Sequence, residues 1–157
     1  MLTSALIHPP LLAALANCGH GSQILIADGN FPYATVIGPN AAVVHLNVRP
    51  GMLTVDEVLH AVRSTVNFEA ATVMSPPQSL AVPAHDGYRD ALGAAVPVTG
   101  IDRFVFYDAV RSADVGLVIA TGDQRAYANL LLTIGVAAAI PAAPASTSDS
   151  VTQYATQ

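Results

Sequence analysis

Charged residues are scarce in this chain. Only 11% of its 157 residues are Asp, Glu, Lys or Arg, whereas 52% are hydrophobic; a typical soluble domain has about 25% charged residues. A domain with so few charges must hide much of its surface, and self-association through an apolar interface does so. We therefore expect a homo-oligomer, built from one domain per chain because 157 residues is the size of a single domain.

Lysine is absent, and the six basic residues are all arginines. The formal net charge is −5. The arginines are spread along the whole chain and form no basic stripe that could follow a phosphate backbone, so we expect no nucleic-acid partner. They stand at Arg49, Arg63, Arg89, Arg103, Arg111 and Arg125.

Cysteine occurs once, at Cys18, so no internal disulfide can form. The five histidines include no pair with the spacing of metal ligands, which argues against a zinc site. No phosphate-binding loop and no dinucleotide fingerprint is present. We therefore expect neither a metal nor a cofactor.

Long apolar runs are also lacking. No segment has the roughly 20 uninterrupted apolar residues that cross a bilayer. The apolar stretch 11–18 has no Lys or Arg before it and follows Pro9-Pro10, which is unlike a secretion signal. The expected location is the cytoplasm, with no membrane contact.

Helical segments alternate with short apolar strands, which predicts an α/β domain over residues 1–136. We expect one compact domain in which a central mixed sheet is flanked by helices on both faces. Thr54 and Glu57 have the spacing of a capping box. Predicted helices cover 11–17, 54–65, 84–94 and 103–112, and predicted strands cover 23–27, 42–48, 70–74, 96–99, 115–120 and 129–136. Residues 137–157 are rich in Ala, Pro, Ser and Thr, which predicts a flexible tail.

His20 is the leading candidate for chemistry. It lies between Gly19 and Gly21, and these small neighbours allow a ligand to approach closely. Imidazole, with an ordinary pKa near ~6.5, suits proton transfer at neutral pH. A capping or solvent-facing histidine would have the same pattern, so spacing alone leaves both interpretations open.

Four further polar residues stand near the ends of predicted apolar segments, where α/β proteins bind small ligands. Asp28 follows the strand 23–27 and could bind hydroxyls or serve only as an Asx-turn residue. Arg103 offers a planar fork of donors, or it forms a surface ion pair with a neighbouring acid. Tyr127 and Asn129 need hydrogen-bond partners, which a ligand or a structural network could supply equally well.

Three segments, in order, resemble the fucose mutarotase and ribose pyranase family. They extend from about residue 5 to residue 136, and their order and spacing make the match fairly specific. The segments are Gly-His-Gly at 19–21 with Ile-Leu-Ile-Ala-Asp-Gly-Asn-Phe-Pro at 24–32; Ile-Asp-Arg-Phe-Val-Phe-Tyr at 101–107; and Val-Ile-Ala-Thr-Gly-Asp at 118–123 with Tyr-Ala-Asn-Leu-Leu-Leu at 127–132.

The resemblance implies an enzyme that interconverts sugar anomers without a cofactor. It implies that His20 transfers the proton and that Asp28, Arg103 and the segment Tyr127-Ala128-Asn129 bind the monosaccharide. Our hypothesis from the chemistry is that the Tyr127 hydroxyl acts as a second proton relay. The Arg-Phe-x-Phe-Tyr pattern that begins at Arg103 is similar to the L-fucose branch. The resemblance also implies a ring-shaped decamer with sites close to subunit boundaries.

The chain departs from the family pattern at several positions. Gln23 replaces a usual acidic residue, Asp123 replaces a usual Glu, and the stretch 45–47 replaces a common Arg-x-Asp-Gly. Three alternatives therefore remain beside a fucose-type mutarotase: an enzyme acting on ribose or another aldose, a non-catalytic sugar-binding or assembly protein, and an α/β module without a ligand.

Overall fold

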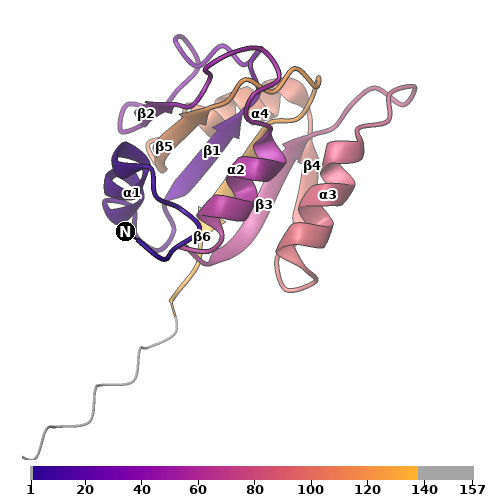
Figure 1. The fold of residues 1–157 in the computed structure, drawn as a ribbon. Coiled ribbons are helices and arrows are strands. Elements are labelled where there is room, and N and C mark those ends of the chain that lie inside the picture. The colour runs from indigo at the N-terminus through magenta and orange to yellow at the C-terminus, as the bar shows by residue number, and fades with distance from the viewer. Residues whose placement is uncertain (1, 138–157) are drawn as a thin grey trace, which may run out of the picture.

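A computed structural model describes residues 2–137 (Figure 1). The predicted tail 137–157 lies, from residue 138 on, outside the described residues. Four helices and six strands follow one another along the chain. Their order is α1 (Pro9–Ala16), β1 (Gln23–Ala27), β2 (Ala42–His45), α2 (Val55–Val62), β3 (Phe68–Met74), α3 (Pro83–Leu92), β4 (Val98–Ile101), α4 (Arg103–Val110), β5 (Val115–Ala120) and β6 (Leu130–Ile134).

All six strands form one mixed sheet in the order β2-β5-β1-β6-β3-β4. The pairs β1–β5, β2–β5 and β3–β4 are parallel, whereas β6 is antiparallel to both of its neighbours, β1 and β3. Five strands therefore run in one direction and only β6 runs in the other. The carboxyl ends of β1 to β5 and the beginning of β6 meet at the same edge of the sheet.

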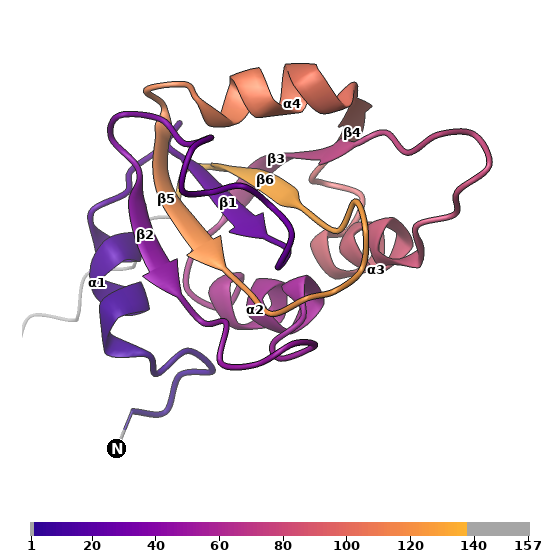
Figure 2. The ribbon, with the colours of Figure 1, turned by 90° about the horizontal axis from the view of Figure 1, so that it is seen from above.

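Helices cover both faces of the sheet, as the sequence predicts. Figure 2 shows α4 on one face, with α1, α2 and α3 on the other. Side chains alternate between the faces along a strand: Ile24 and Ile26 of β1 enter the core under α1, α2 and α3, whereas Leu25 and Ala27 enter the core under α4. The predicted class, a single α/β domain with a mixed sheet, is confirmed.

The start of α2 shows how local sequence fixes a helix. The Thr54 hydroxyl accepts a hydrogen bond from Glu57 N, and the Glu57 carboxylate accepts one from Thr54 N, which is the predicted capping box. The buried side chains of α2 recur at helical spacing, as predicted, at Val55, Val58, Leu59 and Val62. Between residues 2 and 137, no helix has both the length and the apolar character needed to span a membrane.

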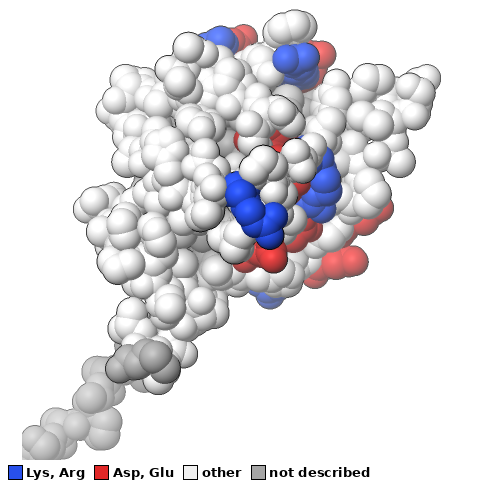
Figure 3. All heavy atoms as spheres, turned by 45° about the horizontal axis from the view of Figure 1, so that its top comes forward, with Lys and Arg blue, Asp and Glu red and all other residues white. Residues whose placement is uncertain are grey.

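Surface charge is as sparse as the composition suggests. On the face drawn in Figure 3, a small group of acidic and basic side chains is surrounded by wide uncharged areas. On α4, the neighbouring side chains of Phe104 and Val105 are 69% and 54% exposed. Large exposed apolar side chains are typical of contact surfaces, which fits the expected oligomer.

Candidate functional site

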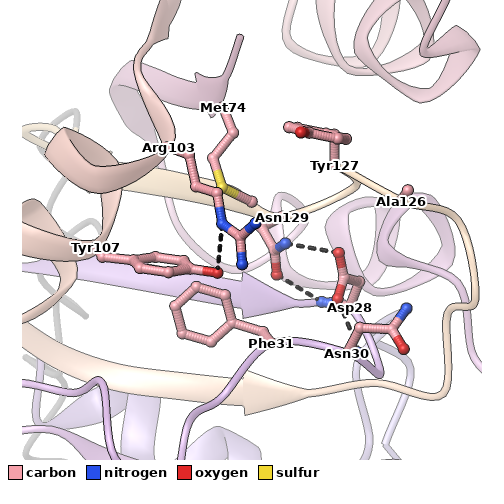
Figure 4. A pocket seen from close by; sticks show the side chains of 9 residues that line it. All are labelled: Asp28, Asn30, Phe31, Met74, Arg103, Tyr107, Ala126, Tyr127 and Asn129. Carbon is pink, nitrogen blue, oxygen red and sulfur yellow. Dashed lines mark hydrogen bonds between the residues drawn. The ribbon is translucent and has the colours of Figure 1, made fainter. Parts of the chain in front are cut away.

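A cavity of about 290 Å³ lies at the sheet edge where β1, β3 and β4 end and β6 begins (Figure 4). This volume is at the lower end of the range of small-molecule sites, about 300–1,000 Å³. The lining side chains come from segments up to 101 positions apart, brought together by the parallel strands. They are Asp28, Asn30, Phe31, Met74, Arg103, Tyr107, Ala126, Tyr127 and Asn129.

Asp28 and Asn129 form a reciprocal pair at the base of this cavity. Asn129 Nδ2 donates to Asp28 Oδ2 at 2.6 Å, and the backbone N–H of Asp28 donates to Asn129 Oδ1 at 2.8 Å. The second carboxylate oxygen of Asp28 accepts the N–H of Asn30 at 2.9 Å, which is an Asx turn. The Asx-turn interpretation of Asp28 is therefore confirmed, and the same side chain lines the cavity.

The environment of Asp28 favours the protonated acid more than water does. Its side chain is nearly buried, with the residue 2% exposed. This burial raises the pKa of the Asp28 carboxyl, and the nearby charge of Asp123 acts in the same direction. Hydrogen bonds from Asn30 and Asn129 offset only part of the effect. Both carboxylate oxygens of Asp28 already accept a hydrogen bond within the protein, from Asn30 N and from Asn129 Nδ2.

Arg103 enters the cavity from the first turn of α4. Its Nε donates to the hydroxyl of Tyr107 at 3.1 Å, and the guanidinium lies 5.3 Å from the centre of the Tyr107 ring. The alternative of an ion pair with a neighbouring acid is wrong, because Asp102 caps α4 at Phe104 N and Asp108 pairs with Arg111. The remaining donors of Arg103 are available to a ligand.

The backbone of Tyr127 has a left-handed conformation, with φ of 62°. Within residues 2–137 it is the single non-glycine residue with positive φ. This conformation costs a residue with a side chain about 1–2 kcal/mol, and such strain concentrates at functional sites. Ala126, Tyr127 and Asn129 all line the cavity, so residues 126–129 form one of its walls.

Ala128 has a different place from its two neighbours. Its side chain is fully buried in the core under α1, α2 and α3 and does not line the cavity. Ala126 lines it instead. Whatever Ala128 contributes to a ligand must come from its backbone, because its side chain faces away.

His20 lies at the opposite edge of the sheet, in the link between α1 and β1. Its side chain is 59% exposed, and Nε2 is 3.1 Å from Oε2 of Glu69 at the start of β3. The five residues of β1 separate this edge from Asp28, and at about 3.3 Å per residue a strand of that length spans roughly 16 Å. One chain thus gathers Asp28, Arg103 and Tyr127 in one cavity but leaves His20 outside it.

Sequence reasoning missed the apolar part of the cavity. Phe31 and Met74 are buried there, and the rings of Phe31 and Tyr107 pack edge to face at 5.5 Å between centroids. The segments that contain Phe31 and Tyr107 were recognised by resemblance, but no local pattern separates a residue lining a cavity from one in the core.

Asp123 has a structural role, in which its carboxylate binds the start of α2 and Arg125. It is 1% exposed, accepts the N–H of Val55 at the start of α2 and binds the guanidinium of Arg125. Burial alone would raise the pKa of its carboxyl, but the hydrogen bonds from Arg125 and Val55 together hold the pKa below the ordinary value. No group of three or more metal-binding side chains occurs between residues 2 and 137.

Comparison with known proteins gives the evolutionary context of this site. The model of the RbsD / FucU transport protein family matches residues 1–137. The chain belongs to this family. FucU from Bifidobacterium longum has 34% sequence identity, and the match covers 83% of this chain and 95% of that one with a TM-score of 0.71.

Two more distant RbsD/FucU structures support the fold. The fucose mutarotase from Streptococcus pneumoniae, solved in complex with L-fucose, is 21% identical, with 88% and 100% of the two chains covered and a TM-score of 0.75. RbsD from Bacillus subtilis, complexed with D-ribose, is 20% identical, with 87% and 99% covered and a TM-score of 0.75. The RbsD/FucU family therefore includes a sugar mutarotase and proteins that bind monosaccharides.

Proposed function

We propose that this RbsD/FucU protein is a cofactor-independent mutarotase that interconverts the anomers of a monosaccharide, most like L-fucose. The observation that carries the proposal is the cavity in which Asp28, Asn129 and Arg103 converge beside the apolar side chains of Phe31 and Met74. Carboxylate, amide and guanidinium groups suit the hydroxyls of a sugar. The apolar side chains suit the methyl group and C–H surface of a deoxy sugar.

Mutarotation requires only proton transfers. The anomeric hydroxyl loses a proton, the ring oxygen gains one, and the reverse steps close the ring on the other face. A positioned acid–base group typically accelerates such steps 10²–10⁴-fold. In the proposal, His20 transfers the proton and the hydroxyl of Tyr127 is the second relay. Asp28, Arg103 and Asn129 hold the sugar hydroxyls, together with the backbone at Ala128.

The proposal requires a second copy of the chain. His20 and the cavity lie at opposite edges of one sheet, so His20 can reach a sugar only in the cavity of a neighbouring subunit. The low charge of the chain and the exposed Phe104 and Val105 beside Arg103 favour such a contact. The proposed assembly is a homo-oligomer, and the family resemblance favours a decamer in the cytoplasm.

Anomer exchange measured by saturation-transfer NMR tests the activity. The wild-type protein should accelerate the exchange of L-fucose, and His20→Ala should return the rate to that of buffer. His60→Ala is a matched control, because His60 is exposed on α2 and outside the cavity. An unchanged rate in His20→Ala would refute the role of His20. Binding of sugar without any acceleration would favour the non-catalytic alternative.

Complementation between two variants tests the shared site. Co-expression of His20→Ala with Tyr127→Phe produces mixed oligomers in which an intact His20 can face an intact Tyr127. Random assembly should give about a quarter of the sites both groups, and activity should recover to about that fraction. A site formed within one chain would give no recovery.

The choice of sugar distinguishes the fucose-type enzyme from the ribose-type alternative. D-arabinose has the ring hydroxyls of L-fucose without the methyl group. If the methyl lies against Phe31 and Met74, kcat/KM should be about tenfold or more higher for L-fucose, since one apolar carbon is worth about 1–3 kcal/mol in a fitted pocket. Faster exchange of D-ribose than of either sugar would support the ribose-type activity.

A further inference from the structure

The wall of the cavity at residues 126–129 is held from behind by α3. Two side chains of this helix donate hydrogen bonds to successive backbone carbonyls of the wall. His85 Nε2 lies 2.9 Å from the carbonyl oxygen of Tyr127. The hydroxyl of Tyr88 lies 2.6 Å from the carbonyl oxygen of Ala128. Neither His85 nor Tyr88 lines the cavity.

The protonation of both side chains follows from their surroundings. A carbonyl oxygen can only accept, so His85 carries its proton on Nε2. His85 is 7% exposed, and this burial lowers the pKa of its imidazole, which keeps the ring neutral. Burial raises the pKa of the fully buried Tyr88, so its hydroxyl remains a donor. Both hydrogen bonds therefore persist at neutral pH.

Tyr127 is the residue of the wall that most needs support. Its φ of 62° is unfavourable for a side chain with a Cβ, so the surrounding contacts must hold it. The hydrogen bond from His85 fixes the orientation of the peptide that follows Tyr127. This peptide joins Tyr127 to Ala128, and the carbonyl of Ala128 accepts the hydrogen bond from Tyr88. Asn129, which lines the cavity, is the next residue.

We propose that His85 is a positioning residue, which keeps Tyr127 in its left-handed conformation and thereby places the side chain of Tyr127 in the lining of the cavity. His85 contacts no sugar in this arrangement, since its hydrogen bond goes to the rear of the wall. The kinetic part of the inference rests on the proposed mutarotase function, whereas the conformational part does not.

Two substitutions separate the hydrogen bond from the packing of His85. His85→Gln can place an amide N–H where Nε2 lies, whereas His85→Leu fills the space without a donor. We expect His85→Leu to lower the exchange rate at saturating sugar about 10–100-fold, comparable to the loss of an outer-shell hydrogen bond that orients a metal ligand. His85→Gln should retain most of the wild-type rate.

A matched control separates positioning from loss of helix stability. Ala91→Gly destabilises α3 by about 1 kcal/mol at a buried position whose side chain has no hydrogen-bonding group. It should leave the exchange rate and the KM of the sugar unchanged. An equal loss of rate in Ala91→Gly and His85→Leu, or a wild-type rate in His85→Leu, would overturn the proposal.

A structural measurement keeps the test independent of the proposed activity. Crystal structures of His85→Leu and His85→Gln report φ of Tyr127 directly. We expect a negative φ in the leucine variant and a positive φ in the glutamine variant. Tyr127 with φ still near 62° in His85→Leu would overturn the inference even if the wild-type protein showed no mutarotase activity at all.

Discussion

Asn129 and Asp28, 101 positions apart in the sequence, satisfy each other's hydrogen bonds in the interior of the protein. The amide of Asn129 donates to the carboxylate and also accepts the backbone N–H of Asp28, so both ends of this amide are used. The pair joins the end of β1 to the start of β6 and forms the base of the cavity. An amide is required here, because a carboxylate cannot donate.

Asn129→Asp should therefore destabilise the protein in a pH-dependent way. Two facing carboxylates share a proton, so their folded-state pKa rises above the unfolded value of about 4. Stability is then retained below pH 4 and lost as the pH rises through the folded-state pKa. We expect a loss of about 3 kcal/mol at pH 7 that shrinks on acidification, measured by urea unfolding. Gln124→Glu, which adds the same charge at an exposed position, should cause little change at either pH.

The left-handed conformation of Tyr127 predicts an unusual order of stability among its variants. Tyr127→Gly should be more stable than Tyr127→Ala by about 1 kcal/mol, because glycine adopts positive φ without strain. At the neighbouring Ala126, which has no positive φ, Ala126→Gly should instead lower the stability. Thermal unfolding measures both comparisons. A more stable Tyr127→Ala than Tyr127→Gly would show that Tyr127 is not strained.

Arg125 should support the fold through Asp123 rather than through a ligand. It pairs with the buried carboxylate of Asp123 and with Asp56. Arg125→Gln should cost about 1–3 kcal/mol at pH 7, a moderate figure because the side chain is 41% exposed to water. Arg111→Gln, which breaks an exposed pair with Asp108, should stay within about 0.5 kcal/mol of the wild type.

The ion pair between Arg125 and Asp123 also predicts how the stability contributed by Asp123 changes with pH. The pKa of Asp123 lies below its ordinary value in the folded protein, so its contribution to stability is present above about pH 4 and is lost as the pH falls through the folded-state pKa. Arg125→Gln should therefore differ most from the wild type near neutral pH. Chemical unfolding at pH 7, 5 and 3.5 checks this, and a difference that grows on acidification would contradict it.

Glu69 should influence the rate of the proton transfer proposed for His20, because the two side chains are in contact. A carboxylate at 3.1 Å from Nε2 of His20 favours a proton on that nitrogen and leaves Nδ1 as the free base. In the proposed mutarotase, Glu69→Gln keeps an acceptor and should slow exchange only a few-fold, whereas Glu69→Leu should slow it about tenfold or more. Identical exchange rates in both variants and the wild type would show that Glu69 plays no part.

Much of the fold was predictable because its signals are local. The apolar run at 23–27 gave β1, and the Thr54–Glu57 spacing gave the start of α2, since capping and helical periodicity involve residues within one or two turns. The separation of His20 from Asp28 came only with the structure, which shows the five residues of β1 extended between them.

By itself, the sequence determined the class of fold, the low surface charge and the residue types available for chemistry, because these follow from composition and short-range spacing. Only the tertiary structure decided which of these residues meet. The strand order, which no local pattern encodes, brings Asp28 to Asn129 and Arg103 and turns Ala128 into the core. It also sets α3 behind Tyr127, and so gives His85 a partner 42 positions away.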